Sequence, residues 1–202
     1  SWGFMRSKNN AGKINCVAVD SDGDVYVAGY FSKKTDVGAP VIGTSGTIVT
    51  GTATQGFEMY LAKYSGVTGA GVWARGIVGD STSVTGFLAV DPDKNAILVG
   101  TFQGTYNFGS NRVMSSQNTI ISNGFAAKYD TNGNIKWAQN FGVFETSLNA
   151  NSGTSAVAVN QLLAGSRSPI VGGGFSKTSN LAGIIKDSNG LNDIFIATLS
   201  PT

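Results

Sequence analysis

The chain has 202 residues, only 13% of them charged, and a formal net charge of +2 at pH 7. Its basic residues are too few and too dispersed to form the patch that nucleic acid or an anionic membrane requires as a partner. No apolar stretch approaches the length of a membrane span, and the absence of histidine removes the commonest general base and metal ligand.

The predicted elements are short strands separated by glycine-rich and polar turns. The 28 glycines, with abundant Ser, Thr and Asn, suit turns and solvated β surfaces rather than helices. In chain order we expect strands at 14–19, 25–31, 57–64, 72–77, 84–90, 96–102, 125–129, 135–141, 155–159, 169–175 and 193–199. The polar connection 32–55 is expected to carry one small strand, at 41–42 or at 47–49.

These strands fall into three repeats of one unit. Each second strand ends in a glycine-containing phrase closed by phenylalanine, and Phe31, Phe102 and Phe175 are 71 and 73 residues apart. A long recurring unit of apolar runs and glycine turns indicates a modular β architecture. Further landmarks recur in the same order: Asp36-Val37-Gly38, Asn107-Phe108-Gly109 and Asn180-Leu181-Ala182, then Lys63-Tyr64 and Lys128-Tyr129, then Trp73-Ala74 and Trp137-Ala138, with Trp2-Gly3 resembling this last pair.

The strands at 14–19 and 25–31 are apolar on both sides, which indicates that both faces of their sheet are buried against other parts of the protein. No segment has the helical periodicity to supply that cover, so sheets must cover sheets, as in a β-propeller. We therefore predict an all-β fold, a β-propeller of about three four-stranded blades in a partial ring. Its expected parts are 1–10, an outer strand of a preceding or partner blade; 11–79, the first blade; 80–144, the second; and 145–202, a third without its last strand.

The repeat resembles the SBBP repeats, which form β-propellers in secreted and surface proteins of bacteria and some other organisms. The likeness lies in Val19-Asp20, in the Val-x-Gly-x-Phe strand, in Asp36-Val37-Gly38, in Ala62-Lys63-Tyr64 and in Trp73-Ala74, with matching residues in the second unit. The third unit departs from it, because Asn160 replaces the Asp, Thr198-Leu199 replaces Lys-Tyr, and the Trp is absent. The resemblance implies an extracellular or cell-surface location.

Closed propellers have about four to eight blades, so three blades are too few to close one. Two explanations stay open: the chain is a segment of a larger protein, or copies of it join head to tail. Either would satisfy the open edge, which otherwise invites aggregation. The expected partners are therefore the remaining blades of a larger chain or other copies, and we predict that the edge at 194–199 pairs with a strand equivalent to residues 2–6.

The acidic turn with Asp20, Asp22 and Asp24 is the candidate metal site, because clustered carboxylates suit Ca²⁺. The alternative is a hairpin turn whose Asp side chains bond local backbone amides. No catalytic residue or other cofactor is expected: Cys16 has no His partner, Glu58 and Glu145 are the only glutamates, and we predict that the chain is not an enzyme.

Two functions fit this inventory. The first is a structural scaffold or adhesive assembly module. The second is a carbohydrate- or protein-binding, lectin-like propeller that uses the variable connections 32–55, 109–123 and 177–192. Phe31, Phe102 and Phe175 are expected in the core, whereas Tyr106, Phe108 and Phe144 lie near loops and are the aromatics expected to be exposed for sugar recognition.

Overall fold

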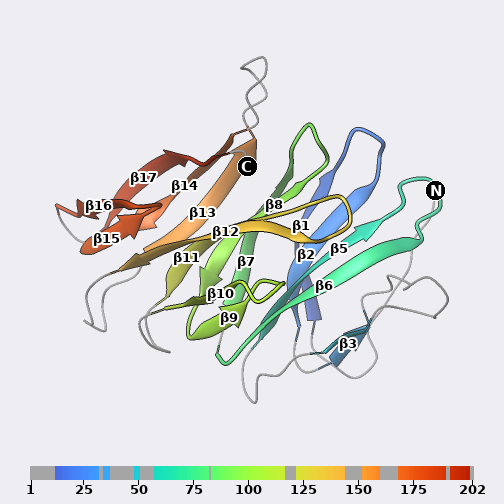
Figure 1. Cartoon of the computed structure of the whole chain (residues 1–202), viewed down its shortest axis with the longest axis horizontal. Coiled ribbons are helices and arrows are strands. Elements are labelled where there is room, and N and C mark those ends of the chain that lie inside the picture. Colours follow the sequence, from blue (N-terminus) through green and yellow to red (C-terminus); the bar gives the residue numbers. More distant parts are fainter. Residues whose placement is uncertain are drawn as a thin grey trace.

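The computed structural model describes residues 12–31, 34–36, 48–50, 57–81, 83–116, 122–143, 152–159, 168–189 and 192–200. Within these ranges the chain forms seventeen strands and no helix, so the predicted all-β class is confirmed (Figure 1). All strand pairings among the described residues are antiparallel. These residues include no helix that could cross a membrane.

Three units with the same order of strands follow one another along the chain (Figure 1). Unit 1 pairs its strands in the order β1–β2–β5–β6, unit 2 in the order β7–β8–β11–β12, and unit 3 in the order β13–β14–β17. Their bounds are β1 Gly12–Val19, β2 Val25–Phe31, β5 Glu58–Tyr64, β6 Gly71–Gly79, β7 Ser83–Val90, β8 Ala96–Phe102, β11 Asn123–Tyr129, β12 Ile135–Val143, β13 Ser152–Val159, β14 Pro169–Phe175 and β17 Asp193–Thr198.

The units also share their register. Phe31, Phe102 and Phe175 lie opposite Glu58, Asn123 and Asp193, the first residues of the third strands. The first two strands of every unit are interrupted by a bulge at the same place, directly after the residue that faces the glycine of the Val-x-Gly-x-Phe phrase or its counterpart. At Gly29 a Cβ would lie 1.8 Å from the Lys13 carbonyl oxygen, so the bulge leaves room for glycine alone.

A short hairpin is inserted between the second and third strands of each unit and, in units 2 and 3, extends the sheet of the preceding unit. Asn107 pairs with Val78 of β6, and Asn180 pairs with Gly142 of β12. In unit 1 the corresponding strands pair with each other. The hairpins are β3 Lys34–Asp36 with β4 Ile48–Thr50, β9 Thr105–Asn107 with β10 Val113–Ser115, and β15 Thr178–Leu181 with β16 Ile184–Asp187.

The sequence predicted only part of these insertions. The small strand expected at 47–49 corresponds to β4, whereas residues 41–42 lie outside the described residues. The connections 109–123 and 177–192 were expected to be loops, and the structure instead places β10, β15 and β16 within them. The repeated Asp36, Asn107 and Asn180 landmark was the available signal, since all three residues lie near the end of the first hairpin strand.

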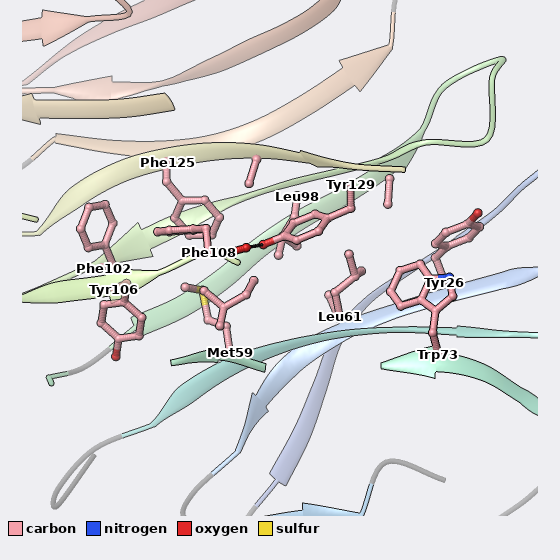
Figure 2. Close-up of a cluster of buried hydrophobic side chains, with 14 residues drawn as sticks. Tyr26, Met59, Leu61, Trp73, Leu98, Phe102, Tyr106, Phe108, Phe125 and Tyr129 are labelled. Atoms are coloured by element: carbon pink, nitrogen blue, oxygen red, sulfur yellow. Dashed lines mark hydrogen bonds between the residues drawn. The ribbon is translucent and has the colours of Figure 1, made fainter. Parts of the chain in front are cut away.

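The sheets bury their apolar sides against each other. One cluster joins Tyr26, Leu61 and Trp73 of unit 1 to Leu98 and Tyr129 of unit 2 (Figure 2). A second joins units 2 and 3, and β7, the first strand of unit 2, lies beside both β1 and β13, the first strands of the other two units. We call the side of a unit that meets the next unit in the chain its rear face, and the opposite side its front face.

Candidate functional site: the acidic turns and the unit faces

The turn proposed as a metal site uses its carboxylates within the protein. Asp20 Oδ1 accepts hydrogen bonds from the backbone amides of Asp22 and Asp24, at 3.0 and 2.9 Å. Asp22 Oδ2 lies 2.5 Å from Lys94 Nζ, which belongs to the equivalent turn of unit 2. The two bonds that Asp20 accepts are the local backbone bonds that the hairpin-turn alternative describes.

Lys63 adds a second partner to this turn. Its Nζ lies 3.3 Å from Asp20 Oδ2 and 3.0 Å from Asp24 Oδ2, and 4.9 Å from the centre of the Tyr26 ring. Burial lowers the pKa of Lys63, but its bonds to Tyr26, Asp24 and Asp20 outweigh burial and leave that pKa raised. The hydrogen bond from the Gly66 backbone amide, and to a smaller extent the contact with Lys63, hold the pKa of the Asp24 carboxyl below its usual value.

Unit 2 has the same lysine–aspartate ion pair, and there both residues are more buried. Lys128 Nζ lies 2.9 Å from Asp91 Oδ2, and both side chains are buried. Asn95 donates to the same carboxylate from its backbone amide and from its side chain. Burial raises the pKa of Asp91, yet the bonds from Lys128 and Asn95 outweigh it and leave the pKa lowered.

Calcium binding at Asp20, Asp22 and Asp24 stays a prediction. Among the described residues no group of three or more His, Cys, Asp or Glu side chains is arranged to hold a metal ion. A notch of about 380 Å³ lies between the two turns, lined by Val19, Asp20, Ser21, Val90, Asp91 and Pro92. Its two aspartates are those already bonded to Lys63 and Lys128.

Cys16 is held as a thiol. Burial raises its pKa to about 11, and its Sγ lies 3.9 Å from the Ala28 carbonyl oxygen. Because the thiolate is the nucleophile, this cysteine is a poor one at neutral pH. It packs against the cluster between units 1 and 2, as a small apolar side chain does.

More of the aromatic residues are buried than the sequence predicted. Phe31, Phe102 and Phe175 are buried, as predicted. Tyr106 and Phe108 are also buried, so the expectation that they are exposed was wrong; Phe144 lies outside the described residues. The hairpin that carries them folds over the end of the aromatic cluster, where their rings pack against Phe102 at 6.0 Å (Figure 2).

Trp73 connects the rear face of unit 1 to the third turn of unit 2. Its indole nitrogen donates to the Thr131 carbonyl oxygen at 2.8 Å, and its ring lies against Gly133. Arg75 donates to the carbonyl oxygens of Asn132 and Gly133 in the same turn. The tryptophan that closes the repeat is thus a contact between units.

Trp137 occupies the equivalent place in unit 2, where the described residues supply no equivalent acceptor. Its indole nitrogen is buried and has no hydrogen-bond partner among the described residues. Since Tyr129 corresponds to Leu199, the counterpart of Thr131 is Pro201, which lies outside those residues. A buried donor without an acceptor costs roughly 1–3 kcal/mol.

The two ends of the row of units expose positions that are buried between units. On the rear side, Leu61 and Ala126 are fully buried, whereas their counterpart in unit 3, Ile196, is 78% exposed and the neighbouring Ile194 is 85% exposed. On the front side, Leu88 and Val90 of unit 2 pack against unit 1, whereas their counterparts Val17 and Val19 are 61% and 58% exposed.

Comparison with models of protein families and with curated proteins found no match for this chain. The SBBP resemblance of its repeat therefore stays a prediction. The site that the structure offers is the exposed rear face of unit 3. On the front side of unit 1, β1 is exposed, whereas Phe31, Tyr60 and Ala62 of the next strands are buried.

Proposed function

We propose that this chain is a non-catalytic scaffold module, a segment of a β-propeller of SBBP type whose four-stranded units stack face to face around an axis. The shared register of the three units and the succession of inner strands β1, β7 and β13 support that arrangement. Each sheet then supplies the apolar cover for its neighbour, because no helical layer is available among the described residues.

The observation that carries the proposal is the exposure of equivalent positions at the two ends. Ile194 and Ile196 are large apolar residues that a solvent-facing strand would not favour, and two internal junctions show that a unit's front face covers such positions. A surface made to receive another unit is what an assembly module needs.

The polar groups support a structural rather than a chemical role. The buried aspartates and lysines are bonded to each other and to turn amides, and the single cysteine is held as a thiol. The low charge content and the SBBP resemblance favour a place outside the cell or on its surface.

Small-angle X-ray scattering and a glycan array test the module. We expect scattering from a curved arc of three units and no signal on the array. A flat stack of sheets would overturn the propeller arrangement, and specific glycan binding would favour the lectin-like function over the scaffold. Protease treatment of intact source cells should release the protein if it lies on the surface.

A further inference from the structure

We propose that two copies of this chain pair through the rear face of unit 3, where isoleucines of each copy fill a glycine-lined hollow of the other. This inference rests on the proposed assembly role and names the partner, a second copy of the chain. On the front side of unit 1, Phe31, Tyr60 and Ala62 are buried within the chain, so this side is not an open face for a second copy. The exposed rear face of unit 3 is therefore left to meet its own equivalent.

Strand alternation defines which residues form the rear face of unit 3. Phe195 of β17 and Val171 and Phe175 of β14 belong to the cluster that joins units 2 and 3. Because successive residues of a strand point to opposite faces, the residues between them lie on the side away from unit 2. In β17 these residues include Ile194 and Ile196, which are 85% and 78% exposed.

The rear face has a ridge beside a hollow. The pairing of β14 with β17 sets Gly174 opposite Ile194 and Gly172 opposite Ile196. The two isoleucines form the ridge along β17, whereas the two glycines leave β14 without side chains at the neighbouring positions. A Cβ added at Gly174 would meet nothing nearer than the Asp193 carbonyl oxygen at 3.7 Å, so there is room above this strand.

The hollow is particular to unit 3. The register places Ala28 of unit 1 and Val99 of unit 2 at the position of Gly172. Both of these side chains are buried at a junction with the next unit. The unit at the end of the row thus differs, at this position, from the two units whose rear faces are covered within the chain.

The rear face of unit 3 also lacks the charge of its counterparts. The third strands of units 1 and 2 carry Lys63 and Lys128 two residues after Leu61 and Ala126, on the same side of the sheet, whereas unit 3 has Thr198 there. In a symmetric pair, a lysine at this position would bring two like charges close together. Its replacement by threonine leaves the face neutral, so the face can meet its own equivalent without repulsion.

A twofold axis that runs along the strands, between β14 and β17, makes the two surfaces match. It places β17 of each copy over β14 of the other, with Ile196 above Gly172 and Ile194 above Gly174. Burying apolar area contributes about 25 cal/mol per Å², so covering both isoleucines favours the pair. One face of a three-stranded sheet is small beside the about 800 Å² that each partner buries in a standard interface, so the pair should be reversible and depend on concentration.

Sedimentation velocity over a series from micromolar to millimolar protein tests the pair. The wild-type chain should shift reversibly from 20.8 kDa towards twice that mass. Ile194→Lys should weaken the association by about tenfold or more, because it sets a charge into the hollow. Val67→Lys is the matched control, because Val67 is also 85% exposed but lies in the turn between the third and fourth strands of unit 1. This control should associate as the wild-type chain does.

A second variant separates the fit of ridge and hollow from general stickiness of the isoleucines. Gly174→Val adds apolar surface and suits a strand, but its side chain fills the hollow that receives Ile194 of the other copy. We expect it to abolish the association. The double variant Gly174→Val/Ile194→Ala removes the clash and should restore part of the association. Stronger association of Gly174→Val than of the wild-type chain would overturn the fit.

The pair and the proposed module can fail separately. A wild-type chain that stays monomeric at every concentration and scatters as a curved arc would overturn the pair and leave the module standing. A dimer that persists in Ile194→Lys would place the contact elsewhere and would also overturn the pair. A flat stack of sheets in scattering would overturn the module, whatever the oligomeric state.

Discussion

Lys128 of β11 and Asp91, at the end of β7, form a buried ion pair across the intervening strand β8, with 2.9 Å between Nζ and Oδ2. The pair joins the first and third strands of unit 2, which share no backbone hydrogen bonds. The same link in unit 1 runs from Lys63 to Asp20. Unit 3 has Thr198 at the lysine position and Asn160 at the aspartate position, so both members of the pair are replaced together.

Removing only one member of the pair should be costly. Lys128→Met leaves the buried Asp91 carboxylate with Asn95 as its hydrogen-bond donor, and breaking a buried pair costs about 3–5 kcal/mol. We expect the free energy of unfolding in urea to fall by that amount. The double variant Asp91→Asn/Lys128→Met should lose less than Lys128→Met alone, as the composition of unit 3 suggests. Lys186→Met, at an exposed position, is the control and should change stability by less than about 0.5 kcal/mol.

The same carboxylate should make the fold sensitive to acid. The folded-state pKa values of Asp91 and Asp24 are lowered, so the unfolded chain binds more protons than the folded chain once the pH falls below about 4. Their stabilisation is complete above that pH and is lost as the pH falls through the folded pKa values. Thermal midpoints measured from pH 7 to pH 2 should therefore decline most steeply below pH 4, and Asp91→Asn should flatten this decline. An equal acid slope in Asp91→Asn would contradict the assignment.

The sequence predicted the strand order and the repeat because both depend on local pattern. The Val-x-Gly-x-Phe phrase, in which Leu98 replaces the Val in unit 2, ends at the same register position in all three units, and its phenylalanine is buried each time. Alternation and glycine position are properties of a few adjacent residues, and repetition raised the signal above that of a single strand.

The long-range contacts, within and between units, could not be predicted in the same way. Asp91 and Lys128 were both visible as landmarks, but their meeting depends on the register of three strands. The attachment of β9 to β6 depends on which sheet edge lies nearby, so Tyr106 and Phe108 were expected in solvent and proved to be buried. Both the ion pair and the burial of these aromatic residues depend on long-range placement rather than on local conformation.

Cys16 should resist labelling in the native protein. Burial raises its pKa to about 11, so little thiolate forms at pH 8, and the side chain is half-buried against the cluster between units 1 and 2. We expect iodoacetamide at pH 8 to label the folded chain at least tenfold more slowly than the chain in denaturant. Equal rates in the two states would show that the first strand is not packed as described.

Gly133 and Gly23 allow the contact between units to be separated from backbone strain. Both have positive φ, 76° and 83°, and both lie in turns with the same Asp-x-x-Gly pattern and hydrogen bond, one between the first two strands of unit 1 and the other between the last two strands of unit 2. A Cβ at Gly23 meets nothing within 4 Å, whereas a Cβ at Gly133 would lie 2.8 Å from Trp73 of the preceding unit. Gly23→Ala should cost about 1–2 kcal/mol from the left-handed conformation alone.

Gly133→Ala should cost more than Gly23→Ala, because the methyl group also displaces the Trp73 ring and weakens its 2.8 Å hydrogen bond to the Thr131 carbonyl oxygen. Urea unfolding of the two variants measures the difference, and the emission of Trp73 should shift in Gly133→Ala alone. If Trp73→Phe removes the extra cost of Gly133→Ala, the contact between units is its source. Equal losses in the two glycine variants would mean that the turn of unit 2 does not lie against unit 1.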